Sequence, residues 1–247
     1  MQSLRITLIS SLLISVAACA GSSPEAGEST SAGQRQDPLD VCAQAPVNLR
    51  SAAKFSILAG ATVTNTGPTV VACDLGVSPG TALTGFLPGK VIGTDHLGDT
   101  TSAIAEGDLT TAYNDAAGRT LCPISLAGNL GGMTLKPGLY KSTSSLEISS
   151  GDLTLDAKGD PTAVFIFQMA STLNTTVGRQ VILQGGAVAA NVFWQVGSSA
   201  TLGAYSVVHG TIMADQSISV ATGATLHGRA LARIGAVTLD TNAVTRP

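Results

Sequence analysis

The chain has 247 residues, of which 12% are charged, and its formal net charge is −3. This length suits one folded domain plus an export segment. The low charge excludes the basic surface that holds nucleic acid or an anionic membrane, so neither is an expected partner. Gly, Thr, Ser, Ala and Val are abundant, which favours short strands and tight turns over helical bundles.

Residues 1–19 have the pattern of a bacterial lipoprotein signal peptide. Arg5 precedes an apolar run over residues 6–16, which is too short to span a bilayer as a mature helix. Residues 16–19, Val-Ala-Ala-Cys, resemble a lipobox, in which the Cys becomes the acylated first residue of the mature protein. We expect lipidation at Cys19, which predicts an exported cell-surface or outer-membrane lipoprotein; ordinary cleavage nearby would instead give a secreted protein.

Residues 20–45 are small and polar and include proline, so we expect a disordered tether followed by one folded domain over 46–247. If Cys19 is lipidated, Cys42, Cys73 and Cys122 remain in an oxidising compartment, where three cysteines allow one disulfide and one leftover thiol. The sequence leaves all three pairings open. We favour Cys73 with Cys122, because these two residues bracket a segment that interrupts a repeat pattern in the chain.

The repeat consists of short strands and is clearest near the C-terminus. Units that begin at Val192, Thr211 and Arg229 are spaced by 19 and then 18 residues. Each holds two or three runs of β-favouring residues separated by Gly, Ser, Asn or Asp. The same frame fits residues 55–73, 138–156 and 164–184. The pattern therefore predicts six stacked coils of three parallel strands, about 4.8 Å apart.

The first strand of each coil is apolar on consecutive residues, as in 164–167 and 192–196, which indicates a sheet covered on both sides. Residues 99–117 predict the helix that covers it. Its apolar stripe comprises Ala105, Leu109, Ala112, Tyr113 and Ala116.

The second strand of each coil alternates between apolar and small polar residues. Its inward residues are predicted to form one ladder, comprising Leu173, Leu202, Val220 and Leu239, with Val63 also inward. Its outward residues are Thr62, Thr64, Thr66, Thr172, Asn174, Thr201, Gly203, Ser219, Ala221 and Thr238. Strand preference explains any single Thr, but solvated faces normally carry Lys, Glu and Arg. We interpret the Thr-rich array as a binding face.

Six segments of the chain closely resemble the DUF3494 ice-binding (antifreeze) protein family. They are 59–67, 74–80, 135–140, 160–168, 191–197 and 228–232, in the family's order. The resemblance implies an all-β solenoid, namely a discontinuous, right-handed, triangular parallel β-helix. It further implies one long α-helix packed along one face and a capping insertion after the first coil.

The resemblance also implies that the flat face without the helix binds ice. The Thr-rich array then becomes the ice-binding face, the partner is an ice crystal surface, and the protein acts as a monomer without a cofactor. Thr suits this task, because its methyl excludes disordered water, its hydroxyl anchors ordered water, and its β-branch limits rotamers. Glu147 falls on or near the array, where a charge would hold liquid-like water.

Catalysis has little support in the sequence, which lacks G-x-S-x-G, H-E-x-x-H, P-loop and dinucleotide motifs. His209 and His227 are expected to stack on adjacent coils, but no Cys, Asp or Glu completes a metal site at ligand spacing. Trp194 is expected to pack in the core. We therefore expect no enzyme and no metal. The alternative to ice binding is an adhesive or structural β-solenoid that binds a protein, a glycan or a mineral.

Overall fold

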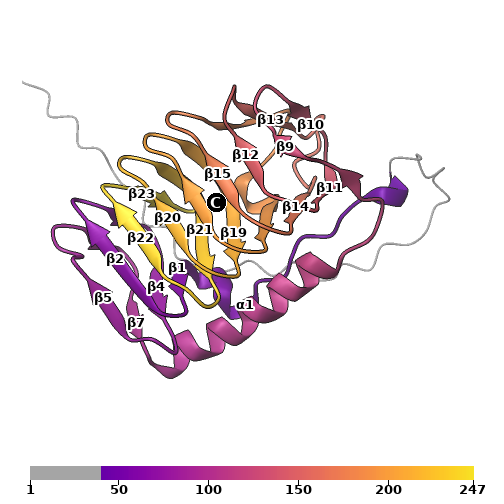
Figure 1. Ribbon diagram of the computed structural model, residues 1–247. Helices are drawn as coiled ribbons and strands as arrows, with labels where there is room; N and C mark the ends of the chain where they lie inside the picture. The colour runs from indigo at the N-terminus through magenta and orange to yellow at the C-terminus, as the bar shows by residue number, and fades with distance from the viewer. Residues whose placement is uncertain (1–39) are drawn as a thin grey trace, which may run out of the picture.

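A computed structural model describes residues 40–247 as a β-solenoid with three faces (Figure 1). The predicted signal peptide, the lipidation site at Cys19 and most of the predicted tether lie outside these residues. Within them, no helix is long and apolar enough to cross a membrane.

The first face is the one that the α-helix covers. In spatial order its strands are β8 (Ile124–Ser125), β11 (Gly138–Ser142), β14 (Phe165–Met169), β17 (Val192–Val196), β19 (Val207–Ala214), β21 (Thr225–Ala232), β1 (Phe55–Ala59), β4 (Asp74–Val77) and β7 (Asp95–Leu97).

The second face is an eight-stranded parallel sheet. In the same spatial order its strands are β9 (Gly128–Asn129), β12 (Leu146–Ile148), β15 (Leu173–Thr175), β18 (Ala200–Leu202), β20 (Ile218–Val220), β22 (Val237–Asp240), β2 (Thr62–Thr66) and β5 (Ala82–Thr84).

The third face completes each coil. Its strands are β10 (Thr134–Leu135), β13 (Leu153–Asp156), β16 (Val181–Gln184), the first halves of β19 and β21, β23 (Ala243–Thr245), β3 (Val70–Val71) and β6 (Lys90–Val91). β19 and β21 turn the corner from the third face to the first without a break, which is why each has eight residues.

The chain does not run through the stack from one end to the other. β1 pairs with β21 on one side and with β4 on the other, so the first coil lies against the last one. After β7, helix α1 (Thr100–Gly118) carries the chain along the first face to the opposite end, where β8 begins the remaining coils (Figure 1). This is the discontinuous arrangement that the resemblance predicted.

Eight coils are present, one for each strand of the second sheet, whereas the repeat pattern predicted six. The two additional coils are β4–β5–β6 and β8–β9–β10. Most of these strands have only two or three residues, which is too short for a clear alternation signal. The segment expected to form a capping insertion therefore continues the solenoid and closes its end with β7.

Apolar side chains from all three faces fill the interior. Tyr140, Phe167 and Trp194 stack along the axis of the solenoid, with ring centroids 5.2 and 4.1 Å apart. The Trp194 indole donates a hydrogen bond to the carbonyl oxygen of His209 at 3.0 Å, which satisfies its only polar atom. The predicted core role of Trp194 is confirmed.

The outer side of the first face is also apolar, and α1 covers it as predicted. Asp99 caps the helix by accepting a hydrogen bond from the Ser102 amide at 2.8 Å. The whole predicted stripe is buried against outward residues of the sheet, which include Phe55, Ile166 and Phe193. The spacing of the stripe, three or four residues, thus fixes the orientation of the helix.

Short 3-10 helices fix the chain before and between the coils. These are η1 (Asp40–Cys42), η2 (Arg50–Lys54) and η3 (Ala189–Asn191). η2 packs on α1, where the Ser51 hydroxyl and amide both donate to the Asp108 carboxylate. The segment before η2 thus lies along the same face as the helix.

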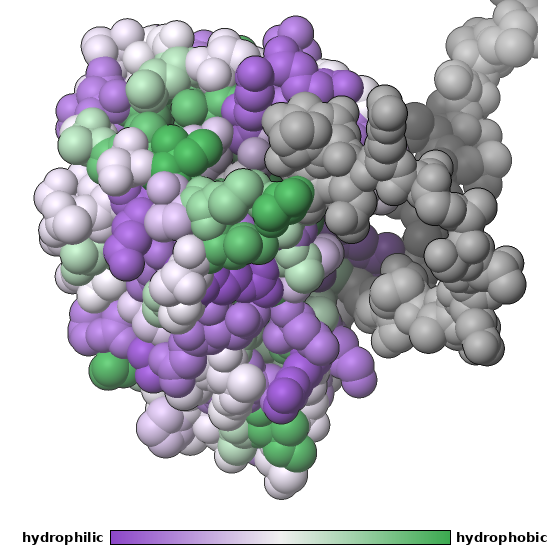
Figure 2. All heavy atoms as spheres, turned by 90° about the vertical axis from the view of Figure 1, so that its right-hand side faces the viewer, coloured by the Kyte–Doolittle hydropathy of each residue, from purple (hydrophilic) through white to green (hydrophobic). Residues whose placement is uncertain are grey.

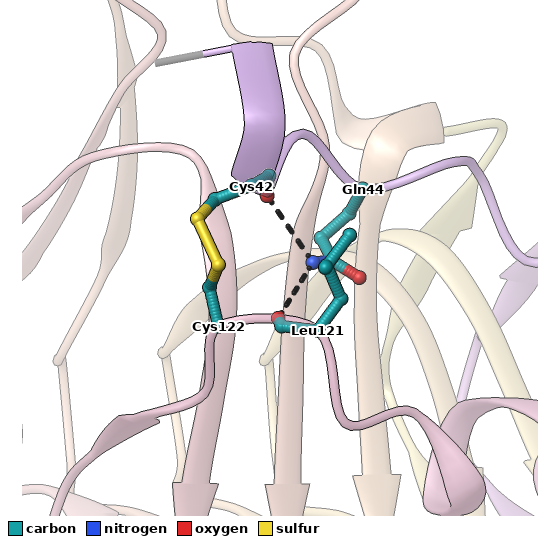
Figure 3. The surroundings of a disulfide bond; sticks show 4 residues. All are labelled: Cys42, Gln44, Leu121 and Cys122. Atoms are coloured by element: carbon teal, nitrogen blue, oxygen red, sulfur yellow. Dashed lines mark hydrogen bonds between the residues drawn. A yellow bond between two sulfur atoms is a disulfide. The ribbon is translucent and has the colours of Figure 1, made fainter. Parts of the chain in front are cut away.

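The predicted Cys73–Cys122 disulfide is wrong, because Cys122 is bonded to Cys42 across a Cα separation of 5.6 Å (Figure 3). The Gln44 amide bridges the two segments by donating to the carbonyl oxygens of Cys42 and Leu121. Cys73 ends the first coil, whereas α1 carries Cys122 to the opposite end of the stack. The sequence prediction thus identified Cys122 as a disulfide residue but chose the wrong partner for it.

Candidate binding face

The outer surface of the second sheet, which we call the hydroxyl face, is the candidate binding surface. Strand pairing places one outward residue of each strand in a single column, which we call the central ladder. In spatial order the central ladder comprises Thr84, Thr64, Thr238, Ser219, Thr201, Asn174, Glu147 and Asn129. Five consecutive rungs, from Thr84 to Thr201, therefore carry a hydroxyl group.

The other predicted face residues flank the central ladder. Thr62 and Thr172 lie two residues before a rung, and Thr66, Gly203 and Ala221 lie two residues after one. All ten predicted residues are at least partly exposed. The structure thus brings together the whole set that the sequence predicted, although position alone does not assign a role to it.

The sequence prediction missed two rungs, Thr84 and Asn129, because they belong to the two coils that the repeat search did not detect. A usable signal was present for Thr84. Residues 82–84 repeat the alternation of residues 62–64 after an interval of 20 residues.

The interior holds the hydroxyl face in register. Leu202, Val220 and Leu239 form one inward ladder, as predicted. Leu173 does not belong to it, because Leu173 pairs with Ala200 in a second inward ladder. Thr175 is the next inward residue of β15, and its hydroxyl accepts a hydrogen bond from the Gly203 amide at 2.9 Å. This polar residue in an apolar position is what shifted the predicted register by two residues.

Parallel pairing makes the hydroxyl face regular in two directions. Adjacent coils are about 4.8 Å apart, and alternate residues along a strand are nearly 7 Å apart. Buried neighbours flank each of the six rungs from Thr64 to Glu147 within its strand, as Val63 and Asn65 do for Thr64. Because an outward side chain between two buried ones has little freedom to move, the rungs form a stiff, repeating surface.

The hydroxyl groups of the central ladder differ in what they bond. The Thr64 and Thr238 hydroxyls lie 3.3 Å apart and bond to each other. Within residues 40–247, the hydroxyls of Thr201 and Ser219 form no hydrogen bond to a protein group. Both of these hydroxyls are therefore available to water.

Two carboxylates lie on or beside the hydroxyl face. Glu147 is a rung of the central ladder and is exposed, as the sequence suggested. Asp240 ends β22 at the margin of the face and pairs with Thr66. The hydroxyls of Thr222 and Thr241 donate to the Asp240 carboxylate, so this charge is partly solvated by the protein.

His209 and His227 stack on adjacent coils of the third face, as predicted, with their ring centroids 4.7 Å apart. His209 Nδ1 lies 2.8 Å from the carbonyl oxygen of Val181, so this nitrogen carries the proton. Burial lowers the pKa of His209, and the neighbouring His227 lowers it further. In the described part of the chain, no group of three or more His, Cys, Asp or Glu residues is placed to hold a metal ion.

Comparison with known proteins gives a consistent result. Residues 57–245 match the family model described as Ice-binding-like. A curated relative, an ice-binding protein of Nostoc sp. (strain HG1), is 49% identical over 199 residues, which cover 79% of this chain and 72% of the relative.

Solved structures agree with the sequence comparison. The crystal structure of an ice binding protein from an Antarctic biological consortium superposes with a TM-score of 0.82 at 52% identity, covering 88% of this chain and 96% of that one. An ice-binding protein from the Antarctic ascomycete Antarctomyces psychrotrophicus superposes with a TM-score of 0.79 at 42% identity, covering 82% and 98%.

Proposed function

Because the chain belongs to the Ice-binding-like family, we propose that it adsorbs to ice through its hydroxyl face. The observation that carries this proposal is the run of five hydroxyl rungs, from Thr84 to Thr201, on a sheet that no helix of residues 40–247 covers. Three relatives whose names state ice binding are at least 37% identical to this chain over the aligned residues.

The chemistry of ice supports this choice of face. An ice surface is a periodic array of water molecules that has no net charge and no protruding group that a protein pocket could enclose. A protein that binds it needs regular spacing, little charge, and groups that hold water without imposing another geometry. The two periodicities of the sheet provide the spacing. The Thr residues provide a hydroxyl beside a methyl on a side chain with few rotamers.

The role that we propose is binding and not catalysis. Many weak contacts spread over the face supply the affinity, so one disrupted region weakens the whole contact. No transition state has to be stabilised, and the face needs no cofactor.

A bulky side chain at the centre of the ladder tests the proposal. Thr201→Tyr places a ring above the face, and because the sheet is stiff, it lifts several neighbouring rungs from the ice. We expect loss of ice recrystallisation inhibition with an unchanged circular dichroism spectrum and melting temperature. Thr154→Tyr on the third face is the matched control, because Thr154 is also an outward strand residue, and it should keep full activity.

Two results would contradict the proposal. The first is a wild-type protein that neither shapes ice crystals nor inhibits recrystallisation at high concentration; an adhesive solenoid would then be the better account. The second is equal loss of activity in Thr201→Tyr and Thr154→Tyr.

We also propose that acylation at Cys19 places the domain on the cell surface, on the strength of the lipobox-like residues 16–19. In a bacterial host the wild-type protein should fractionate with membranes and carry the mass of a lipid. Cys19→Ala should block this processing. A wild-type protein that is wholly soluble and free of lipid would contradict acylation and leave the ice proposal intact.

A further inference from the structure

The central ladder changes character along its length. From Thr84 to Thr201 each rung ends in a short hydroxyl, and four steps of about 4.8 Å make this stretch roughly 19 Å long. The next rungs are Asn174, Glu147 and Asn129, which are longer and more polar. The ladder therefore has a hydroxyl part and a carboxylate-amide part.

The side chains of the second part are occupied by bonds to the protein. The Asn174 amide donates to the Thr172 hydroxyl at 3.1 Å, and the Ser149 hydroxyl donates to Glu147 at 2.9 Å. The Asn129 side-chain oxygen accepts from the amides of Ser149 and Gly131. These groups follow the geometry of the protein and not that of a water lattice.

Glu147 is the strongest departure from an ice-compatible surface. Its side chain is exposed, and within residues 40–247 it forms no ion pair with a cation. Contact with a crystal face would strip water from this carboxylate with no opposite charge to compensate, which is unfavourable. Asp240 differs, because it lies at the margin of the sheet and accepts bonds from two hydroxyls.

We infer that ice contact is confined to the hydroxyl part of the central ladder and that the Glu147 carboxylate sets its limit. This inference rests on the proposed function and adds the extent of the contact to it. The contacting rungs run from Thr84 to Thr201, and the rungs Asn174, Glu147 and Asn129 face liquid water.

This arrangement fits the course of the chain. The described chain begins at the Glu147 end, where the Cys42–Cys122 disulfide ties it beside β8 (Figures 1 and 3). The last coil at this end also leaves Leu121, Ile124 and Met133 exposed, and Figure 2 shows apolar and polar residues mixed on this end surface. The hydroxyl rungs thus lie at the end remote from the chain entry.

One substitution at two rungs tests the extent of the contact. Thr238→Lys and Glu147→Lys place the same charged group on the same ladder, at exposed positions on neighbouring parts of one sheet. We expect Thr238→Lys to lose most of the thermal hysteresis of the purified full chain, and Glu147→Lys to keep the wild-type value, because a charged group still limits the contact at this rung. Circular dichroism and melting curves verify that both variants fold.

Glu147→Gln tests the cause, because it removes the charge and nearly preserves the size. If the carboxylate sets the limit, this variant should show higher thermal hysteresis than the wild type. Active wild type with an inactive Glu147→Lys variant would overturn the confinement, and unchanged activity in Glu147→Gln would overturn the role of the charge. A wild type without ice activity would instead show that the proposed function itself is wrong.

Discussion

The first face and the hydroxyl face are built from the same coils and share one interior, yet within residues 40–247 a helix covers only the first. Outward residues of the first face are large and apolar, as at Leu139, Ile166 and Phe193, which are neighbours in one column. Outward residues of the hydroxyl face at matching coils are Glu147, Asn174 and Thr201. The backbone is the same in both cases, so the outward column alone decides what each face can bind.

This difference explains the position of the helix. Each buried Leu, Ile or Phe side chain contributes about 1.5–3 kcal/mol relative to exposure, and several of them line the first face. Packing of α1 on the first face therefore stabilises the folded protein. The hydroxyl face would gain little from such cover, and stays available for a partner outside the chain.

The shared interior should give the largest effect on stability. Leu202 is fully buried in the inward ladder directly behind the hydroxyl face. Leu202→Ala should lower the free energy of unfolding by about 2–5 kcal/mol, because it removes apolar contacts and leaves a cavity. Urea unfolding followed by circular dichroism measures this loss. A loss below about 1 kcal/mol would show that the ladder does not support the sheet.

Exchanging the outward chemistry of the two faces should give the next largest effect. Ile166 is fully buried under α1, so Ile166→Thr removes apolar contacts there and buries an additional hydroxyl. We expect a loss of about 2–4 kcal/mol in unfolding free energy. Wild-type stability in this variant would show that α1 is not packed on the first face.

The covered face also contains a carboxylate that should make its stability depend on pH. Burial raises the pKa of Glu106 on α1 to about 8, although the nearby Arg233 opposes this rise. Within the described residues neither oxygen of this carboxylate has a hydrogen-bond partner. The folded protein thus holds a proton that the unfolded chain releases near pH 4.5.

A group whose pKa is raised on folding stabilises the protein fully below its unfolded pKa, and this contribution is lost as the pH rises through the folded value. Wild-type stability relative to Glu106→Gln should therefore fall between pH 4.5 and pH 8. The fall should be on the order of 1–2 kcal/mol after solvent screening. Unfolding curves at pH 5, 7 and 9 for both proteins measure it, and parallel pH profiles would contradict the buried carboxylate.

The reverse exchange should have the smallest effect on stability. Thr201→Ile adds an apolar group to an exposed rung of the hydroxyl face. We expect the unfolding free energy to change by no more than about 0.5 kcal/mol, as for most surface substitutions. Together with a large loss in Ile166→Thr, this result would show that the two faces differ because α1 packs on one of them, and not because their backbones differ in stability. A large loss would indicate a hidden contact at Thr201.

The sequence predicted the parts of the fold that depend on periodicity. The apolar stripe of α1 has a helical period, and the second-face strands β2, β18, β20 and β22 alternate clearly, so the helix and the hydroxyl face were both found. It missed the two coils whose strands mostly have two or three residues, because such short strands give only a weak alternation signal. It also placed Leu173 in the wrong ladder, because Thr175 is a buried polar residue.

The disulfide shows a different limit. Pairing depends on which coils end up together, and α1 separates Cys73 from Cys122 by the length of the stack although both flank the same segment. Nothing local to a cysteine reports this separation. The ligand of the hydroxyl face is likewise not encoded in a local pattern. The alternation places Thr201 on the outer surface, and only an experiment tests its contact with ice.

The most direct test is a competition for ice within one sample. An equal mixture of wild type and Thr201→Tyr is frozen slowly onto a cold surface, and the ratio of the two proteins in the ice is measured by mass spectrometry. We predict that the ice becomes enriched in the wild type while the liquid becomes enriched in Thr201→Tyr. An unchanged ratio in both phases would contradict ice binding through the hydroxyl face.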